Sequence, residues 1–276
     1  MKGESQKGLP PLIERFEMKF TIPFSMIKPI SEFASVYCSL DKYSQRSENT
    51  YYKVNNLYFD TPEYLLLRMR MMGVQNRFNL RVRSYGDDVG MPYFLEIKQK
   101  TGQIVRKYRA KVIDPNWFNV YTEPGFESTG ESEDPLEVRN RTLFERLVYS
   151  YNASPKVLTQ YIRKAWVSDV DDYGRVTFDR ELMYKPEREY NLVPDDDLML
   201  ACDPETVFDP DCSVVLELKC YSAFVPLWMI DLIRYFDLQR RSFSKYMTGV
   251  REVLGLDVYS SPSTASNVRF KGEKNV

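Results

Sequence analysis

The sequence predicts an α+β fold: a closed antiparallel β-barrel with a polar, cationic interior and helices packed outside. Two observations predict it. Segments of alternating polar and apolar residues follow one another along most of the chain, separated by short turns and without a βαβ pattern. In several of these segments the polar positions are charged, so that helices covering the apolar faces would leave the charged faces inside.

Period-two alternation predicts nine strands. They cover residues 13–22, 51–59, 77–85, 93–100, 104–112, 157–167, 175–184, 198–202 and 214–220. Helices are expected at residues 23–40, 63–72, 136–151 and 226–254, the second after the start signal Thr61 and Pro62. Segments 122–135 and 186–197 are expected to be solvated loops. We expect one domain at residues 11–256, a flexible N-terminus at 1–10 and a disordered tail at 257–276.

The whole-chain composition limits the classes of partner. The chain has 38 Lys and Arg and 39 Asp and Glu residues, which gives a net charge of −1. This balance argues against a protein that binds nucleic acid or membrane surfaces through its overall charge. The longest mainly apolar stretch, residues 226–233, is far shorter than the roughly 20 residues of a spanning helix, and no apolar signal-peptide region is seen. We therefore expect a cytoplasmic protein with no transmembrane segment, which is compatible with a separate membrane partner.

Histidine is absent from the chain, which excludes Ser-His-Asp and Cys-His catalysis and HExxH metal sites. The cysteines form no CxxC pair and are expected to be buried, reduced thiols; they are Cys38, Cys202, Cys212 and Cys220. The remaining side chains for chemistry are Lys, Arg, Asp, Glu, Tyr and Ser, which suit phosphate and oxygen-bound cations.

Charged side chains share one face of several expected strands. Arg81 and Arg83 point to one side of their strand, and Leu80 and Val82 to the other. The same division recurs in segments 15–20, 95–100, 107–111, 175–179 and 216–219. In any single strand, the simpler explanation is that the charged face is the solvent-exposed outside of an antiparallel sheet. Taken together, the apolar faces need helical cover, which places the cations inside.

Cations that line a barrel repel one another, and a desolvated ion is costly unless it is paired. Such an interior must be wet and filled with counter-charge. A nucleoside triphosphate or polyphosphate supplies that charge, and arginine supplies forked donors for phosphate oxygens. Interior carboxylates could then hold Mg²⁺ or Mn²⁺ against the phosphates.

A set of short motifs resembles a known family. They are YKVNNLYFDTP at residues 52–62, LRVRSYG at 80–86, LEIK at 95–98, YIR at 161–163, RVTFDREL at 175–182, LELK at 216–219 and SKY at 244–246. In this order they resemble the VTC-type polyphosphate polymerases, which are triphosphate tunnel metalloenzymes of the CYTH-like superfamily. The resemblance spans residues 14–253, and it implies the triphosphate tunnel fold for this chain.

The resemblance also implies roles for individual residues. Those implied to grip nucleotide phosphates and the product chain are Lys19, Arg81, Arg83, Lys98, Lys107, Arg163 and Arg175, with Tyr161 beside them. Glu217 is implied as the metal-binding carboxylate. Lys245, with Ser244 before it, is implied to contact the transferring phosphoryl group, and Arg81 and Arg83 complete the expected catalytic set.

Some of these assignments have alternatives. Arg109 or Lys111 could replace Lys107 after a two-residue shift in register, and Lys245 could instead be a solvent-exposed lysine at a helix start. Tyr58 and Phe59 are expected to belong to the core. Asp60 is expected to cap the next helix, because its carboxylate can accept backbone N–H groups.

The first strand departs from the tunnel hydrolases, which resemble one another in an ExExK pattern. Arg15 stands here where the first glutamate is expected, followed by Glu17 and Lys19. This departure disfavours a two-metal, water-activating hydrolase. The resemblance therefore implies an ATP-polyphosphate phosphotransferase that uses Mn²⁺ or Mg²⁺, acts on ATP and inorganic polyphosphate, and releases ADP. The alternatives are a triphosphatase or nucleotide hydrolase that uses Glu17 and Glu217, and a non-catalytic polyphosphate- or nucleotide-binding module.

Overall fold

One antiparallel sheet contains ten strands among the residues that the structure describes, which in this computed structural model are 15–86, 89–102, 104–123, 134–201, 214–221, 225–241 and 243–254. The strands are β1 (Arg15–Ile22), β2 (Cys38–Leu40), β3 (Tyr52–Asp60), β4 (Asn76–Tyr85), β5 (Tyr93–Thr101), β6 (Ile104–Val112), β7 (Ser154–Ser168), β8 (Gly174–Pro186), β9 (Leu200–Ala201) and β10 (Val214–Tyr221). The α-helices are α1 (Ile27–Ala34), α2 (Lys42–Arg46), α3 (Leu65–Met71), α4 (Asn119–Thr122), α5 (Pro135–Ser150), α6 (Leu227–Tyr235) and α7 (Lys245–Leu254). A short 3₁₀ helix, Phe24–Met26, precedes α1.

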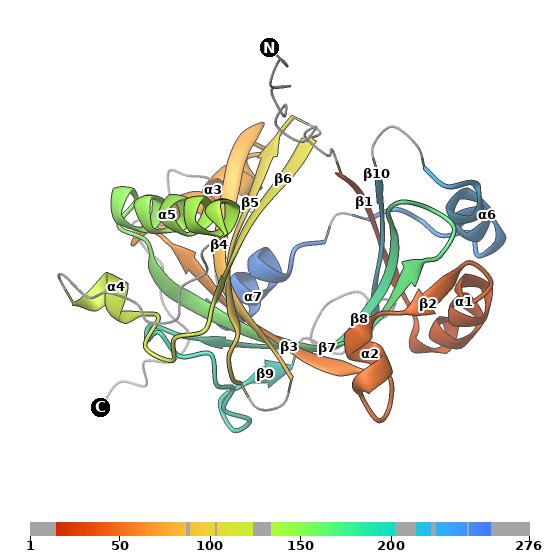
Figure 1. Ribbon diagram of the computed structural model, residues 1–276, viewed down its shortest axis with the longest axis horizontal. Helices are drawn as coiled ribbons and strands as arrows, with labels where there is room; N and C mark the ends of the chain where they lie inside the picture. Colours follow the sequence, from red (N-terminus) through yellow and green to blue (C-terminus); the bar gives the residue numbers. More distant parts are fainter. Residues whose placement is uncertain are drawn as a thin grey trace, which may run out of the picture.

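The sheet curls around a central space but does not close into a barrel (Figure 1). Its strand order is β2-β7-β3-β4-β5-β6-β1-β10-β8-β9, and β7 also pairs with β8. Between β6 and β1, however, the only matched pair in the described strands is Arg15 with Val105. The strands are antiparallel, so residues that follow Arg15 in β1 lie opposite residues that precede Val105. β6 begins at Ile104, and most of β1 therefore has no partner in β6. The predicted closed barrel is therefore not formed along the β6–β1 boundary.

A different segment covers the edge of β1 that β6 leaves unpaired. The backbone N–H of Arg241 donates to the carbonyl oxygen of Lys19 at 2.9 Å, and Phe20 forms an isolated bridge with Arg240. The chain reaches this position after a turn at Asp237, whose φ of 46° is left-handed. This excursion breaks the single helix predicted at residues 226–254 into α6 and α7.

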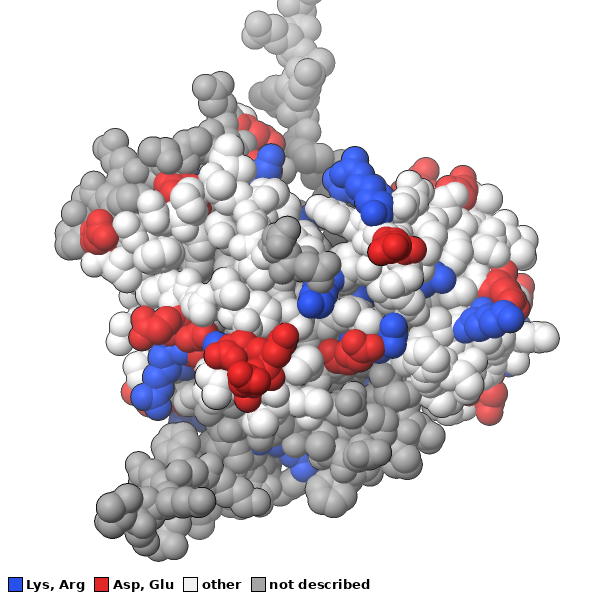
Figure 2. All heavy atoms as spheres, turned by 90° about the horizontal axis from the view of Figure 1, so that it is seen from below, with Lys and Arg blue, Asp and Glu red and all other residues white. Residues whose placement is uncertain are grey.

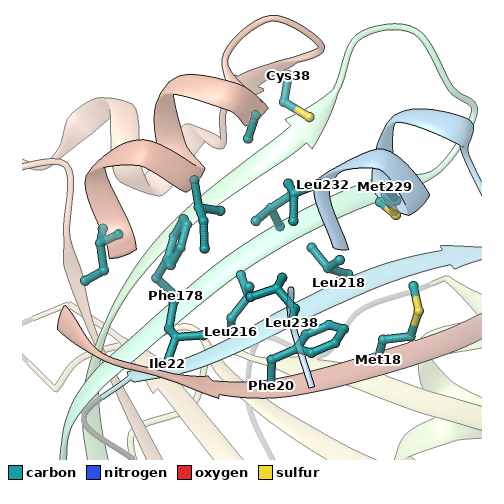
Figure 3. Close-up of a cluster of buried hydrophobic side chains, with 14 of the residues drawn as sticks. Met18, Phe20, Ile22, Cys38, Phe178, Leu216, Leu218, Met229, Leu232 and Leu238 are labelled. Atoms are coloured by element: carbon teal, nitrogen blue, oxygen red, sulfur yellow. The ribbon is translucent and has the colours of Figure 1, made fainter. Parts of the chain in front are cut away.

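The apolar faces of the strands pack outward against helices, as the alternation predicts. Met18, Phe20 and Ile22 of β1 lie in one buried cluster with residues of β8, β10, α1 and α6 (Figure 3). A second cluster joins the outer faces of β3 to β6 with α5. Strands with one apolar face become stable in this way, since each buried Leu, Ile or Phe side chain contributes about 1.5–3 kcal/mol.

One helix contradicts the prediction that the helices pack outside. Tyr246 and Val250 of α7 are buried against Tyr161 of β7, Tyr184 of β8 and Val215 of β10, and Figure 1 shows α7 within the curl of the sheet. These sheet residues belong to the inner face. The inner space therefore has an apolar part, where α7 packs against the sheet.

Gly249 sets how closely α7 approaches the sheet. A Cβ at this position would lie 2.2 Å from Cδ1 of Tyr184, a distance that requires the helix or the ring to move. We expect Gly249→Ala to lower the free energy of unfolding by about 1–3 kcal/mol, despite alanine's better helix propensity. Urea unfolding would measure this. Arg251→Ala on the exposed side of α7 is the control, and equal stability of the two variants would contradict the packing.

The segment predicted as a helix at residues 23–40 contains only one turn of 3₁₀ helix and α1. It then forms β2, in which Cys38 pairs with Ser168 and Leu40 with Trp166 of β7. The pairing with a distant strand overrides local helix propensity. Asp41, directly after β2, accepts a hydrogen bond from the backbone N–H of Ser44 at 2.9 Å and caps α2, a helix that sequence patterning missed.

Asp60 caps the next helix, as predicted. Its carboxylate is fully buried and accepts backbone N–H groups of Thr61, Leu66 and Leu67 at 2.7–2.9 Å. It also accepts the hydroxyl of Tyr246 at 2.6 Å, which joins α3 to α7. The YFDTP and SKY motifs therefore meet through this hydrogen bond.

Cys38 and Cys220 are buried free thiols, as predicted. Other expectations lie outside the described residues: those for segments 1–10 and 257–276, for Cys202 and Cys212, and for most of the loop at 122–135. No described helix combines the length and the apolar character that crossing a bilayer requires.

Candidate functional site

A cavity of about 1130 Å³ lies inside the curl of the sheet. Among the described residues, its lining includes 16 of the chain's 38 Lys and Arg side chains but only 5 of its 39 Asp and Glu side chains. Much of the compensating negative charge lies elsewhere, and Figure 2 shows several groups of Asp and Glu on one outer face. A protein of net charge −1 thus contains a concentrated cationic interior.

Every residue predicted for the site lines this cavity. They are Lys19 of β1, Arg81 and Arg83 of β4, Lys98 of β5, Lys107 of β6, Tyr161 and Arg163 of β7, Arg175 of β8, Glu217 of β10, Ser244, and Lys245 of α7. The strand residues converge because period-two alternation turns all of them to the inner face. Their roles in binding or catalysis remain predictions.

A buried carboxylate that the sequence prediction missed organises one wall of the cavity. Glu96 is 1% exposed, and its Oε2 lies 2.7 Å from Nη2 of Arg81. Its Oε1 lies 2.6 Å from Nζ of Lys107 and 3.4 Å from Nε of Arg109, and Arg83 is 3.8 Å away. Burial alone would raise the pKa of Glu96, but these cations outweigh it and hold the pKa well below its usual value. The LEIK motif could have predicted that Glu96 lies in the cavity, because Glu96 lies on the same face of its strand as Lys98.

A second group of charges surrounds Glu217. Its Oε1 lies 3.1 Å from Nζ of Lys19 and 3.5 Å from Nζ of Lys245, and its Oε2 lies 2.6 Å from Nζ of Lys219. Burial opposes ionisation, but the three ammonium groups hold the pKa of Glu217 well below its usual value. The carboxylate therefore serves as the counter-ion of these three lysines.

Lys245 is not the solvent-exposed lysine of the alternative interpretation. It is 7% exposed, and its Nζ lies 2.6 Å from Oδ2 of Asp179. Burial would lower the pKa of Lys245, but Asp179 and Glu217 raise it, so the ammonium remains charged. Asp179, which the prediction also missed, forms a bidentate pair with Arg163 at 2.6 and 2.7 Å.

The structure shows where the alternatives to Lys107, and Tyr58 and Phe59, lie relative to the cavity. Both Lys107 and Arg109 line the cavity, whereas Lys111 is exposed and is absent from the lining. Phe59 belongs to the core, as predicted. Tyr58 is also buried in a core cluster, as predicted. It lines the cavity as well, and its hydroxyl accepts a hydrogen bond from Nη1 of Arg81 at 3.1 Å.

The carboxylates of the predicted metal site already have cationic partners. In the part of the chain that the structure describes, no three His, Cys, Asp or Glu side chains come together as a metal site. Glu217 is surrounded by three lysines, and Glu17 lies 2.6 Å from Nζ of Lys98. Ammonium groups at these distances occupy carboxylate lone pairs and repel a divalent cation. These residues do not fit a resident Mn²⁺ or Mg²⁺.

The chain has low similarity to several solved structures. A candidate adenylate cyclase from Bacillus halodurans is 12% identical, with a TM-score of 0.47 over 84% of this chain and 94% of that one. A candidate adenylyl cyclase from Hippeastrum with a dominant triphosphatase activity is 14% identical, with a TM-score of 0.45 over 90% of this chain and 100% of that one. At such scores these similarities carry no conclusion about function.

No curated protein matches the chain. The family model of the VTC domain, in contrast, matches residues 14–254, a range that contains every strand and helix described above and all of the predicted site residues. The chain therefore belongs to the VTC domain family.

Proposed function

We propose that this protein is an ATP-polyphosphate phosphotransferase, which transfers the terminal phosphoryl group of ATP to the end of a growing polyphosphate chain and releases ADP. The observation that carries the proposal is the cavity, in whose described lining Lys and Arg outnumber Asp and Glu by 16 to 5. A linear polyanion matches that excess, and membership of the VTC domain family supports a polyphosphate-related reaction.

The ion pairs of the cavity explain how the fold can contain so many cations before a ligand binds. Buried cations without counter-charge would destabilise the fold, and Glu96, Glu217 and Asp179 supply part of that charge. Phosphate oxygens can take over contacts with these same Lys and Arg side chains, because charge-assisted bonds to phosphate resemble those to carboxylate. The carboxylates thus hold the cations in place in the absence of ligand.

The proposed reaction needs no protein nucleophile. An anionic oxygen of the acceptor's terminal phosphate forms a bond to the γ-phosphorus of ATP. The bond from that phosphorus to the β–γ bridging oxygen breaks, and its electron pair stays on the β-phosphate of ADP. Arg81, Arg83 and Lys245 would stabilise the negative charge that spreads over the transferring group, since positioning and electrostatics supply most of the catalysis in phosphoryl transfer.

A divalent cation would enter this reaction with the nucleotide. Since the carboxylates present do not fit a resident metal, we propose that Mn²⁺ or Mg²⁺ arrives bound to ATP phosphates. Glu217 would keep its role as the counter-ion of Lys19, Lys219 and Lys245. The same observation disfavours the hydrolase alternative, in which Glu17 and Glu217 would activate water, because both carboxylates already have lysine partners.

The test is to incubate the purified protein with ATP and Mn²⁺ and to resolve the products by gel electrophoresis and ³¹P NMR. Internal polyphosphate resonances that are lost in Glu217→Ala and Lys245→Met, but kept in the exposed-surface control Arg139→Met, would support the polymerase. Orthophosphate without chain growth would identify a hydrolase. Unchanged ATP together with tight binding would identify a binding module.

Anion binding is expected to depend on pH through Tyr85 and Lys107. Burial alone would raise the pKa of Tyr85, but Arg83 and Arg109, which donate to its hydroxyl at 3.3 and 3.4 Å, bring it to about 7. Burial lowers the pKa of Lys107 to about 7. A polyanion prefers neutral tyrosine and charged lysine, so affinity should fall as pH rises through both pKa values.

Isothermal titration of tripolyphosphate into wild type and Tyr85→Phe, between about pH 6 and pH 8.5, measures the contribution of Tyr85. The ligand's own titration is common to both proteins and cancels in the comparison. We expect the affinity of the phenylalanine variant to fall less steeply with pH, because its ring cannot become anionic. Identical slopes would show that Tyr85 stays neutral throughout.

A further inference from the structure

One wall of the cavity is aromatic rather than cationic. Tyr43 of α2, Tyr85 of β4 and Phe94 of β5 all line the cavity and are half-buried. The rings of Tyr43 and Tyr85 stack with centroids 4.8 Å apart, and those of Tyr85 and Phe94 meet edge to face at 5.6 Å. Phosphate groups gain little from aromatic faces. This wall, hereafter the aromatic wall, therefore suits a different part of a ligand.

Arg109 adds a second planar group to the aromatic wall. Its guanidinium carbon lies 3.6 Å from the centroid of the Phe94 ring. Its Nε faces Glu96 at 3.4 Å and its Nη2 donates to the hydroxyl of Tyr85 at 3.4 Å. Contacts at its edges and on one face thus orient the guanidinium, while 38% of the side chain remains exposed. An oriented guanidinium plane is a surface on which a nucleobase can stack.

The aromatic wall adjoins the predicted phosphate site. The same Oε1 of Glu96 that faces Arg109 also lies 2.6 Å from Nζ of Lys107, and Arg83 contacts Tyr85. A ligand with a flat ring at one end and phosphates at the other would therefore meet ring-binding and phosphate-binding groups in adjacent positions.

We propose that the aromatic wall and Arg109 bind the nucleobase of the phosphoryl donor, which extends its phosphates along the cavity from Lys107 towards Arg81, Arg83 and Lys245. The proposal rests on the proposed function, because it specifies how that donor is recognised. In this arrangement the protein prefers a nucleoside triphosphate to inorganic tripolyphosphate, because only the nucleotide has a base to contact Tyr43, Tyr85, Phe94 and Arg109.

The experiment compares two ligands that share three linked phosphates but differ in the base. Isothermal titration would measure ATP and tripolyphosphate binding to wild type and to Arg109→Lys, which keeps the charge but loses the planar stacking surface. We expect ATP affinity to fall about tenfold, with tripolyphosphate affinity unchanged within about twofold. Arg77→Lys, the same exchange at a cavity arginine outside the aromatic wall, should not distinguish the ligands.

A second pair of variants tests the rings. Tyr43→Leu should weaken ATP binding selectively, whereas Tyr43→Phe, which keeps the ring, should keep the preference for ATP over tripolyphosphate. If Arg109→Lys and Tyr43→Leu weaken both ligands equally, or neither, the aromatic wall only supports the sheet and the proposal is wrong. Wild type that binds ATP selectively through these residues but forms no polyphosphate would overturn the proposed function and leave the base site standing; wild type that binds neither ligand would overturn both.

Discussion

Replacing Glu96 with glutamine is expected to lower the melting temperature of the ligand-free protein by roughly 10 °C. The carboxylate is 1% exposed and is the shared partner of four cations. Removing one member of a buried charge network costs about 3–5 kcal/mol, and each kcal/mol corresponds to about 2–4 °C in a protein of this size. Differential scanning fluorimetry would measure the change.

The same variant gives a second readout. Because glutamine leaves Arg81, Arg83 and Lys107 with less counter-charge, tripolyphosphate should raise the melting temperature of Glu96→Gln more than that of wild type. Glu32→Gln is the matched control: Glu32 is largely exposed and pairs with Lys28 at 3.9 Å within α1, a kind of contact worth less than about 1 kcal/mol. Equal melting temperatures for the two variants would show that Glu96 does not neutralise the cavity.

Replacing Arg81 with methionine is expected to abolish most turnover and to leave the fold intact. Arg81 touches both Glu96 and Tyr58, and its guanidinium would face the transferring phosphoryl group. Loss of one such electrostatic group typically lowers kcat by about 10²–10³-fold. The fold should persist because Glu96 keeps Arg83, Lys107 and Arg109 as partners.

Polyphosphate formation measured at saturating ATP, together with the melting temperature, separates catalysis from stability in this variant. Arg81→Lys should retain part of the activity, since it keeps the charge but not the forked donor geometry. Arg139→Met on the exposed side of α5 should behave as wild type. An Arg81→Met protein as active as wild type would rule out the proposed role of Arg81.

Glu96 and Arg81 represent the two kinds of charge in the cavity, the carboxylates and the cations. The cavity needs its cations to bind a polyanion, and it needs a few carboxylates to keep those cations in place before the ligand arrives. A carboxylate that neutralises too well would compete with phosphate. Among the residues that the structure describes, the lining has 16 Lys and Arg and 5 Asp and Glu, which leaves a net positive charge for the ligand to neutralise.

Alternation in the sequence determined which side chains share the interior. Arg81, Arg83 and Lys98 could be assigned to one face because successive side chains in a strand point to opposite sides, and the structure places them in one cavity. The charged and apolar faces, the positions of nine of the ten described strands and the capping role of Asp60 follow from residue order within a few positions. Local patterns carry this information because it concerns neighbours along one strand or turn.

Tertiary structure alone decided which charges meet and where the sheet ends. Glu96 and Asp179 were visible in the sequence, but their cation partners come from other strands and from α7, and no local pattern encodes those distances. The open boundary between β6 and β1 depends on one register, Arg15 with Val105, and α7 entered the interior because the chain turned at Asp237 and first paired with β1. Pairing between distant segments overrides local propensity, and that is why only the folded chain revealed these features.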